Sequence, residues 1–371
     1  MKKSNKTIYF ITGGGTGGHI YPAVAVADFL NKDDKNKIYY IGNPKNLEYE
    51  VVKQKGYDFL GVNVHAMPRK LSFKLFVWVL QLFMAVLQAM YYISVYKPNV
   101  VFGTGGYVSA PALIAAKILK VPFVMHDCDT NPGLVTRKLA PWASSVSLAF
   151  GSAQVYIKNE NCYVNGNPIR EKFKTLTKEQ ARKDLGLADK MTVCIMGGSQ
   201  GAKSINITAV EILKTLSQNY NTQVIFQTGK KNYDYVKLKL SKIYPEYEKD
   251  KNLLVKPYFN DMVTVLKASD IAVSRAGSLS ISELCASSVA TIFVPYPHAA
   301  ADHQRKNARV MEENGAGLYI EDSDVTSKRL LNLITDLINN SEKLSLIRQN
   351  AQKLARLNAT DDIVKQIKDS I

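Results

Sequence analysis

Short apolar runs rich in β-branched and aromatic residues recur along the first half of the chain, and each leads into a helical stretch or a loop. Four such runs are TIYFIT, KIYYIG, PNVVFGTGG and VPFVMH, all within residues 7–126. Strands that alternate with helices predict a parallel sheet covered by helices.

The same pattern restarts after about residue 170, which predicts a second sheet. Its runs are MTVCIMGG, TQVIFQTG, NLLVKP, DIAVSRAG and ATIFVPYP. Between the two halves, a Gly-Asn-Pro turn that ends at Pro168 leads into a charged stretch with weak periodicity, so we place the interdomain linker there. The 371 residues are about twice the size of a usual domain. We therefore expect an α/β protein with doubly wound parallel-sheet domains at 1–168 and 169–357.

One segment allows three interpretations. Leu75–Tyr96 holds 22 residues without a charge, which is long enough to span a bilayer. Gln81, Gln88 and Ser94 interrupt the run, and its removal would take a crossover helix from the first sheet, so spanning is disfavoured. A helix buried in the core and a helix that packs by one face and touches lipid with the other remain open.

In the lipid-touching interpretation, aromatic side chains enter the membrane and nearby basic residues contact anionic head groups. The aromatic residues are Phe73, Phe76 and Trp78, and the basic residues are Arg69, Lys70 and Lys74. The formal net charge of +16 agrees with an anionic partner, which can be a nucleic acid, a phosphorylated substrate or an acidic membrane face.

Cysteine usage and the N-terminus indicate a reducing cytoplasm. The four cysteines are far apart and form no Cys-x-x-Cys pair, which argues against a zinc knuckle and a disulfide framework. The apolar run before the first glycines is too short for the core of a signal peptide, so we expect no export by that route.

Three glycine-rich turns follow predicted strands, at residues 13–18, 103–106 and 197–201. The first matches the dinucleotide fingerprint Gly-x-Gly-x-x-Gly, but the second strand runs into Gly42-Asn43-Pro44 instead of the acidic residue that would hold a ribose. A nicotinamide oxidoreductase is therefore the least favoured class. His19 follows this turn and is a candidate general base, or it only hydrogen-bonds the backbone.

The third turn, GGSQGAKS, approximates a Walker loop, with Ala202 where glycine is required. Its glycines still let the backbone approach a ligand closely, and Ser199 can donate a hydroxyl. A tight turn without a ligand is the alternative.

The segment SRAGSLSISELCASS predicts an anion site at a helix start. Gly277 opens the helix, and the free amides of residues 278–280 suit a diphosphate. Glu283 can accept hydrogen bonds from ribose hydroxyls or only complement the helix dipole, and Gln304 can reach the same nucleotide.

Six ordered motifs, TGGGTGGHIYPAVAVA, KPNVVFGTGGYVSAP, GNPIR, GGSQGAKSIN, SRAGSLSISEL and PHAAADHQRKNA, resemble those of the MurG family of glycosyltransferases over nearly the whole chain. The resemblance implies transfer of N-acetylglucosamine from UDP-GlcNAc to lipid I in peptidoglycan synthesis, and so a part in cell shape and division. It also implies a GT-B fold, in which two Rossmann-like domains face a central cleft and a C-terminal helix, about residues 358–371, packs on the first domain. The partners would be UDP-GlcNAc, lipid I and an anionic membrane surface on the cytoplasmic side, with no nucleic acid.

The resemblance also assigns residues to the donor. Its donor set is Thr16, Gly17, Gly18, Asp129, Arg170, Ser199, Phe259, Ser278, Leu279, Ser280, Ile281, Ser282, Glu283 and Gln304. Phe259 would contact the uracil through its backbone. Asp129 stands where many relatives carry Asn, and its carboxylate can accept but not donate a hydrogen bond.

For catalysis, we expect His19 to deprotonate the C4 hydroxyl of the muramyl sugar, with Asp127 as the second candidate. Arg170 and the helix amides would offset charge on the departing UDP, and the anomeric carbon would invert. No Asp-x-Asp pair resembles a metal site, so we expect no obligatory metal and no cofactor. The alternatives are a diacylglycerol glycosyltransferase, a UDP-GlcNAc 2-epimerase-like isomerase and a binding module.

Overall fold

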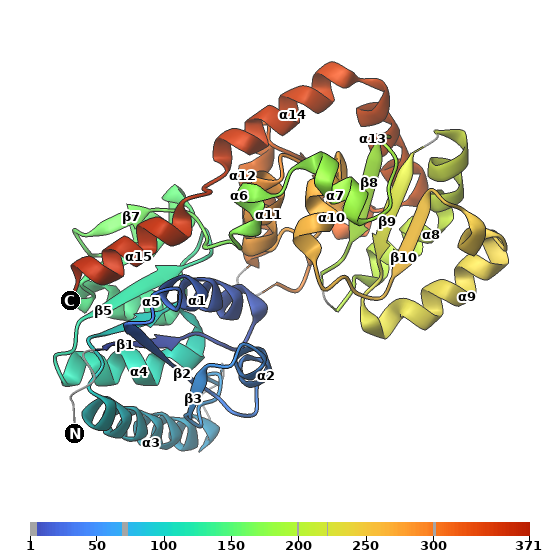
Figure 1. Cartoon of the computed structure of the whole chain (residues 1–371). Helices are drawn as coiled ribbons and strands as arrows, with labels where there is room; N and C mark the ends of the chain where they lie inside the picture. Colours follow the sequence, from blue (N-terminus) through green and yellow to red (C-terminus); the bar gives the residue numbers. More distant parts are fainter. Residues whose placement is uncertain (1–5, 69–72, 199, 221, 300–301) are drawn as a thin grey trace. The chain divides into compact units, whose positions relative to one another are not determined.

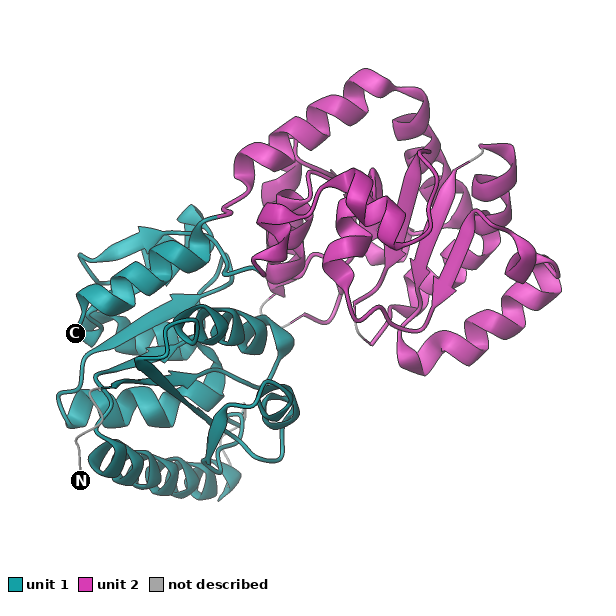
Figure 2. Ribbon diagram, viewed as in Figure 1, with its two compact units in different colours: residues 1–169, 358–371 teal, residues 170–357 magenta. Residues whose placement is uncertain are grey.

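The computed structural model describes residues 6–68, 73–198, 200–220, 222–299 and 302–371. The chain divides into two compact units, which we call unit 1 (residues 1–169 with 358–371) and unit 2 (residues 170–357) (Figures 1 and 2). Each unit is built on its own parallel sheet, which confirms the predicted fold class of two doubly wound α/β domains.

Unit 1 contains, within its described residues, a seven-stranded sheet in the order β3-β2-β1-β4-β5-β6-β7. The strands are β1 (Thr7–Thr12), β2 (Asn36–Gly42), β3 (Asp58–Gly61), β4 (Val100–Gly103), β5 (Phe123–Asp127), β6 (Ser145–Leu148) and β7 (Cys162–Val164), and their pairings are parallel. The strand order reverses between β1 and β4. Open α/β sheets bind ligands at such a point, beyond the carboxyl ends of the strands.

Helices cover both faces of this sheet. They are α1 (Gly17–Leu30), α2 (Leu47–Gln54), α3 (Phe73–Tyr96), α4 (Gly106–Ile118), α5 (Leu134–Leu139) and α15 (Ala359–Asp369), with short 3-10 turns η1 (Ala140–Trp142) and η2 (Gly151–Tyr156). Along β1, Tyr9 and Ile11 pack with α1 and α15, whereas Phe10 packs with α3 and α4. This alternation buries both faces, as the near-continuous apolar runs of parallel strands require.

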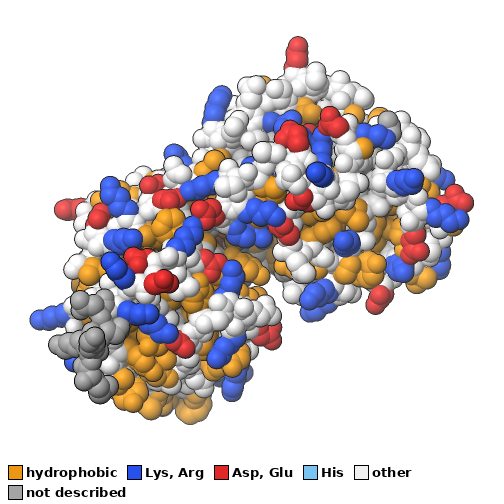
Figure 3. Space-filling model, viewed as in Figure 1, with side chains coloured by type: hydrophobic (Ala, Val, Ile, Leu, Met, Phe, Trp, Pro, Cys, Tyr) orange, Lys and Arg blue, Asp and Glu red, His pale blue; other side chains and the backbone are white. Residues whose placement is uncertain are grey.

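Helix α3 is apolar on all sides, but only one side is buried. Among the described residues it is the helix long and apolar enough to cross a membrane, and 17% of its 18-residue apolar window is buried. Ala85, Val86, Ala89 and Ile93 pack in the core against the sheet. The exposed side carries Phe73, Phe76, Val77, Val79, Leu80, Phe83, Met84, Leu87, Tyr91 and Val95. α3 lies at the lower edge of unit 1 in the view of Figure 1, and apolar side chains gather along that edge in the same view (Figure 3).

Unit 2 repeats the plan with a six-stranded sheet over the residues described, in the order β10-β9-β8-β11-β12-β13. The strands are β8 (Thr192–Met196), β9 (Gln223–Gln227), β10 (Leu253–Lys256), β11 (Ile271–Ser274), β12 (Ala290–Phe293) and β13 (Leu318–Tyr319), again paired in parallel. The strand order reverses between β8 and β11. The turns that follow these two strands are the glycine-rich turn at 197–201 and the turn that opens at Gly277.

The helices of unit 2 are α6 (Lys172–Thr175), α7 (Lys178–Asp184), α8 (Lys203–Lys214), α9 (Tyr233–Ile243), α10 (Met262–Ala268), α11 (Ser278–Ala286), α12 (His303–Glu313), α13 (Ser327–Asn339) and α14 (Ser341–Leu354). Single turns are η3 (Thr215–Asn219, π-helical), η4 (Lys230–Asn232), η5 (Tyr247–Lys249) and η7 (Asp322–Asp324). The main core of unit 2 joins β8, β9 and β11 to α8, α9, α13 and α14.

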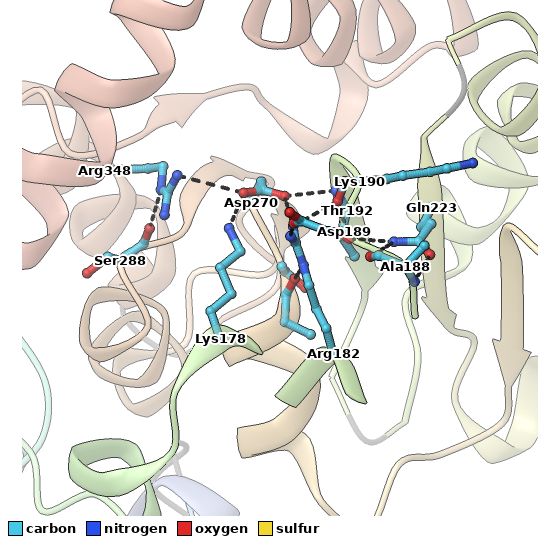
Figure 4. A network of polar contacts seen from close by, with 12 residues as sticks. Lys178, Arg182, Ala188, Asp189, Lys190, Thr192, Gln223, Asp270, Ser288 and Arg348 are labelled. Atoms are coloured by element: carbon cyan, nitrogen blue, oxygen red, sulfur yellow. Dashed lines mark hydrogen bonds and ion pairs between the residues drawn. The ribbon is translucent and has the colours of Figure 1, made fainter. Parts of the chain in front are cut away.

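A buried carboxylate, Asp270, ties two helices to this sheet (Figure 4). Its side chain is 8% exposed and pairs with Lys178 and, at 2.8 Å, with Arg182, both on α7. It also accepts from the backbone N–H of Thr192 at 2.9 Å and lies 3.7 Å from the guanidinium of Arg348 on α14. α7 lies near the start of unit 2, and α14 lies near its end. Asp270 therefore links both ends of unit 2 to its sheet.

Candidate active site

Two glycine-rich turns of unit 1 interlock at the carboxyl ends of β1 and β4. A Cβ atom on Gly13 would lie 2.0 Å from the hydroxyl oxygen of Thr104, and a Cβ atom on Gly106 would lie 2.9 Å from the imidazole ring of His19. Gly106 also has a φ of +72°, which favours glycine. The absence of side chains therefore allows the ring of His19 to pack directly against the second turn.

The imidazole of His19 is held by the backbone of that turn. Its Nδ1 lies 2.8 Å from the carbonyl oxygen of Thr104, and the hydroxyl of Thr104 donates to the carbonyl oxygen of His19 at 2.6 Å. Because a carbonyl can only accept, we assign the imidazole proton to Nδ1. Nε2 then carries the lone pair, which is the form that a general base needs.

Asp127 lies next to His19, at the end of β5. A Cβ atom on Gly105 would be 3.7 Å from Oδ2 of Asp127 and 3.6 Å from Cε1 of His19. The carboxylate of Asp127 is 1% exposed and accepts backbone N–H bonds from Asp129 at 3.2 Å and from Gly133 at 3.1 Å. The structure therefore brings the two predicted catalytic residues together, and it engages both oxygens of Asp127 in the loop that follows β5.

Cys128 completes this cluster. Its sulfur lies 3.8 Å from Nδ1 of His19, and burial, followed by the charges of Asp129 and Asp127, raises the pKa of the thiol well above its ordinary value. Asp127, Cys128 and Asp129 also form the one group of potential metal ligands in the described chain, with ligand atoms within 4.8 Å of one another. The set fits a metal poorly, because backbone amides already engage both oxygens of Asp127.

The start of α1 holds Thr16, Gly17 and Gly18, three of the four donor residues predicted in unit 1, and the fourth, Asp129, follows β5. Thr16 is exposed, and its carbonyl oxygen accepts from the N–H groups of His19 and Ile20, both at 3.1 Å. The amides of Gly17 and Gly18 precede these first helical bonds. They can therefore donate to an anion or to a hydroxyl.

In unit 2, the turn after β11 opens helix α11 in the way that the sequence predicts. The backbone at Gly277 is extended, and the first helical bond runs from Ile281 N to Gly277 O at 2.9 Å. The amides of Ser278, Leu279 and Ser280 precede that bond. Amides in this position, at the positive end of the helix dipole, have the arrangement that an anion site requires.

Arg170 and Glu283 are an ion pair beside this helix start. The Nη2 atom of Arg170 lies 2.9 Å from Oε1 of Glu283, whose side chain is 16% exposed. Burial raises the pKa of the Glu283 carboxyl, and the guanidinium of Arg170 counteracts part of the rise. The structure therefore joins two predicted donor residues that are 113 positions apart in the sequence. In the next turn of the helix, the hydroxyl of Ser282 donates to Ser278 O at 3.2 Å.

Phe259 and Gln304 are each held through a backbone amide. The N–H of Phe259 donates to Oε1 of Gln227 at 2.9 Å. Gln227 is buried and also donates to Gly198 O at 3.3 Å, so it links this loop to the third glycine-rich turn. Oε1 of Gln304 accepts from the N–H of Tyr296 at 2.9 Å.

The third glycine-rich turn packs closely against the residues that follow β9. Ser199, which the sequence assigned to the donor, lies outside the described residues. A Cβ atom on Gly201 would lie 2.1 Å from the carbonyl oxygen of Thr228, so this glycine is required for the fit. Ser204, the last residue of the Walker-like pattern, donates to Asp322 at 2.6 Å and accepts from Arg275 at 3.1 Å. Its hydroxyl is thus engaged inside the protein, which removes the Walker interpretation.

Several residues of these sites were missed in the sequence. Gln227 and Thr104 lie in predicted strands or turns, but their roles depend on partners more than 25 positions away. Arg275 was quoted only as part of a motif, yet its guanidinium, 12% exposed, bonds Asp322 and the carbonyl oxygens of Val294 and Pro295. An arginine directly after the apolar strand run DIAVS was the sequence signal that could have identified it.

The chain matches models of known protein families. Residues 9–148 match the glycosyltransferase family 28 N-terminal domain, and residues 192–367 match the glycosyltransferase family 28 C-terminal domain. A protein of Thermoanaerobacter pseudethanolicus is 38% identical over 364 residues, which cover 97% of this chain and 99% of that protein. A protein of Halothermothrix orenii is 36% identical over 363 residues, with 97% and 98% coverage. Both are named "UDP-N-acetylglucosamine--N-acetylmuramyl-(pentapeptide) pyrophosphoryl-undecaprenol N-acetylglucosamine transferase".

Solved structures place the fold in the same group. The crystal structure of Acinetobacter baumannii MurG superposes with a TM-score of 0.76 at 26% identity and covers 98% of this chain and 99% of that one. A putative UDP-N-acetylglucosamine 2-epimerase of Listeria monocytogenes superposes with a TM-score of 0.69 over 98% of this chain and 96% of that one, but at 13% identity it shares only the fold. The near full-length identity to the named transferases shows that the chain belongs to the MurG family of glycosyltransferases, which have the GT-B fold.

Proposed function

We propose that this chain transfers N-acetylglucosamine from UDP-GlcNAc to the C4 hydroxyl of the muramyl sugar of lipid I, which forms lipid II for peptidoglycan synthesis. The observation that carries the proposal is the 38% identity, over 97% of the chain, to a protein named for this transfer. The polar residues described in the two units can supply the groups that this reaction needs: an anion site for the diphosphate, an acceptor for the ribose hydroxyls and a general base.

Unit 2 is proposed to bind the donor. The diphosphate lies against the amides of Ser278, Leu279 and Ser280, an attraction worth about 0.3 to 1 kcal/mol per charge at an exposed helix start. Glu283 accepts hydrogen bonds from the ribose hydroxyls, and Arg170, already at 2.9 Å from Glu283, offsets charge on the diphosphate.

The remaining donor contacts are proposed from the same carried-over set. The carbonyl of Phe259 accepts from the uracil, and Gln304 donates through its side-chain amide. Ile281 and Ser282 hold the first turn of α11, where Ile281 N bonds Gly277 O. Ser199, Thr16, Gly17, Gly18 and Asp129 complete the set.

Unit 1 is proposed to activate the acceptor. Nε2 of His19 takes the proton of the C4 hydroxyl as the oxygen attacks the anomeric carbon, while the bond from that carbon to the UDP oxygen breaks and UDP leaves with the electron pair. Attack from the opposite face inverts the anomeric carbon. We rank Asp127 after His19 because its two oxygens accept N–H bonds from Asp129 and Gly133. A carboxylate held in this way has fewer lone pairs left to accept a proton from a substrate.

We also propose that unit 1 rests on the anionic, cytoplasmic face of the membrane through the exposed side of α3, because lipid I is anchored in lipid. Phe73 is 78% exposed and Met84 is 62% exposed, which a water-facing helix would avoid. Lys74 is exposed beside Phe73, and Arg69 and Lys70 lie outside the described residues. We favour a peripheral helix over a spanning one, since spanning would remove Ala85, Ala89 and their neighbours from the core.

Two variants test the assignments in a transfer assay with labelled UDP-GlcNAc and a lipid I analogue. His19→Ala should lower kcat by about 100- to 10,000-fold, the usual contribution of a general base, with little change in the donor KM. Glu283→Ala should raise the donor KM by about tenfold or more, because it removes charge-assisted hydrogen bonds.

Exposed residues of the same type provide matched controls for these variants. His65→Ala in unit 1 and Glu313→Ala in unit 2 should behave as the unsubstituted chain does. Full turnover by the His19 variant would remove His19 from the mechanism, and an unchanged donor KM in the Glu283 variant would remove Glu283 from the donor site.

A further inference from the structure

A buried carboxylate hydrogen-bonds the backbone of the first glycine-rich turn. Glu48, the second residue of α2, is fully buried, and its Oε2 accepts the backbone N–H of Gly15 at 3.1 Å. Its Oε1 accepts the backbone N–H of Asn43 and the side-chain amide of Asn46, each at 3.2 Å. Three N–H donors thus converge on the two oxygens of one carboxylate.

Two glycines make room for this carboxylate. A Cβ atom on Gly14 would lie 2.6 Å from the carboxyl carbon of Glu48, and a Cβ atom on Gly42 would lie 3.0 Å from its Cγ. The crowding of glycines before His19 therefore has a cause inside the protein, because a larger residue at position 14 would displace Glu48.

The opposite side of the turn is held as well. The amide of Asn46 also donates to the hydroxyl of Tyr107 at 3.1 Å, and a Cβ atom on Gly15 would lie 2.9 Å from the ring of Tyr107. The hydroxyl of Tyr40 donates to Gly13 O at 2.6 Å. The backbone from Gly13 to Gly15, just before the helix that carries His19, is thus held by contacts with Glu48, Tyr40 and Tyr107.

In dinucleotide-binding sheets, amides of the corresponding turn receive a diphosphate. Here the amide of Gly15 is already bonded to Glu48. We propose that Glu48 is a positioning residue that acts as an internal anion. It occupies the glycine turn of unit 1 in place of a diphosphate and fixes the backbone that sets the position of His19.

The kinetic consequence rests on the proposed function, in which His19 is the base. Glu48→Gln is the direct test, since glutamine keeps the shape but turns one oxygen into an N–H donor that must face either Gly15 N or Asn43 N. We expect the amide of Gly15 to exchange with deuterium about tenfold faster or more, as the loss of a bond to a charged acceptor implies. We also expect kcat to fall about tenfold or more, with the KM for UDP-GlcNAc within about twofold of the unsubstituted value.

Glu50→Gln is the matched control, because Glu50 lies on the same helix and is exposed. Gly14→Ala is a second variant that displaces the carboxylate without changing Glu48, and it should reproduce both effects if Glu48→Gln folds poorly. An exchange rate at Gly15 equal to that of Glu50→Gln, or an unchanged kcat in variants with the faster exchange, would overturn the proposal. The proposal would also be overturned if the activity that each variant loses equals the fraction of that variant that is unfolded. If the unsubstituted chain transfers no sugar, the proposed function fails, and the exchange measurement alone decides whether Glu48 holds the turn.

Discussion

Two histidines of unit 1 show how local contacts give one residue type opposite properties. His19 is partly exposed and keeps Nε2 for a substrate, because the carbonyl of Thr104 engages Nδ1. His126 is fully buried, with Nε2 at 3.0 Å from Oδ1 of Asn167 and Nδ1 at 3.2 Å from the hydroxyl of Ser147. Burial lowers the pKa of His126 to about 4. One ring is thus suited to take a proton, and the other stays neutral and structural.

The lowered pKa of His126 predicts acid sensitivity of unit 1. The unfolded chain binds this proton near pH 6.5 and the folded chain near pH 4, so the contribution to stability is complete above pH 6.5 and is lost as the pH falls toward 4. At pH 5, the free energy of unfolding should therefore be about 2 kcal/mol lower from this group alone. Both tryptophans, Trp78 and Trp142, lie in unit 1, so urea unfolding followed by tryptophan fluorescence reports on this unit.

His126→Gln is the comparison for this measurement. The variant should be less stable at pH 7.5, because it disturbs the bonds to Asn167 and Ser147, but it should lose about 2 kcal/mol less than the unsubstituted chain between pH 7.5 and pH 5. Equal losses in both proteins would show that His126 does not cause the acid sensitivity.

Among single residues, those that lie in consecutive sequence motifs could be predicted from the sequence. Those that hydrogen-bond one motif to a distant segment could not. The start of α11 and the turn before His19 could be identified, because a glycine-rich strand exit followed by a helix has a local signature. Glu48, Thr104 and Gln227 have none. The turn residues that they contact, Gly15, His19 and Gly198, lie 33, 85 and 29 positions away and meet them through the order of strands in each sheet.

The elements were predicted where a strand has a long apolar run. β1, β2, β4 and β5 of unit 1 fall on the predicted runs, as do β8 to β12 of unit 2. The strands β3, β6, β7 and β13 were not identified, because no long apolar run marks them in the sequence and their pairing comes from neighbouring strands. For α3, the sequence left a buried and a lipid-facing helix open, and the structure shows that one side is exposed.

The exposed side of α3 predicts binding to anionic vesicles. Phe76 and Phe83 are seven positions apart, which places them on one side of the helix, and they are 59% and 58% exposed. Replacement of both by serine should lower the partition onto vesicles that contain phosphatidylglycerol by about 30-fold, since each ring loses roughly 1 kcal/mol of burial in lipid. Flotation of vesicles with bound protein measures this partition.

Leu238→Ser is the control for the vesicle experiment. Leu238 is 57% exposed, but it lies on α9 of unit 2 and should not change the partition. If the two phenylalanine substitutions leave vesicle binding intact, the exposed side of α3 is not the contact with the membrane.

At the scale of the whole molecule, each unit repeats one topology, but the polar groups at the strand ends differ. Unit 1 fills its first glycine turn with Glu48 and presents His19, whereas unit 2 presents the amides that open α11 beside Arg170 and Glu283. The charge of +16 agrees with substrates that carry diphosphates and with an acidic membrane surface. This division of groups is the physical basis for our proposal that unit 1 activates the acceptor alcohol and unit 2 holds the nucleotide.

The most direct test is to incubate the purified chain with labelled UDP-GlcNAc and a lipid I analogue and to determine the anomeric configuration of the product. Our account predicts label in a lipid-linked disaccharide, joined through the C4 oxygen of the muramyl sugar, with the anomeric carbon inverted relative to the donor. A product with retained configuration, or conversion of UDP-GlcNAc to its 2-epimer with no label in lipid, would contradict it.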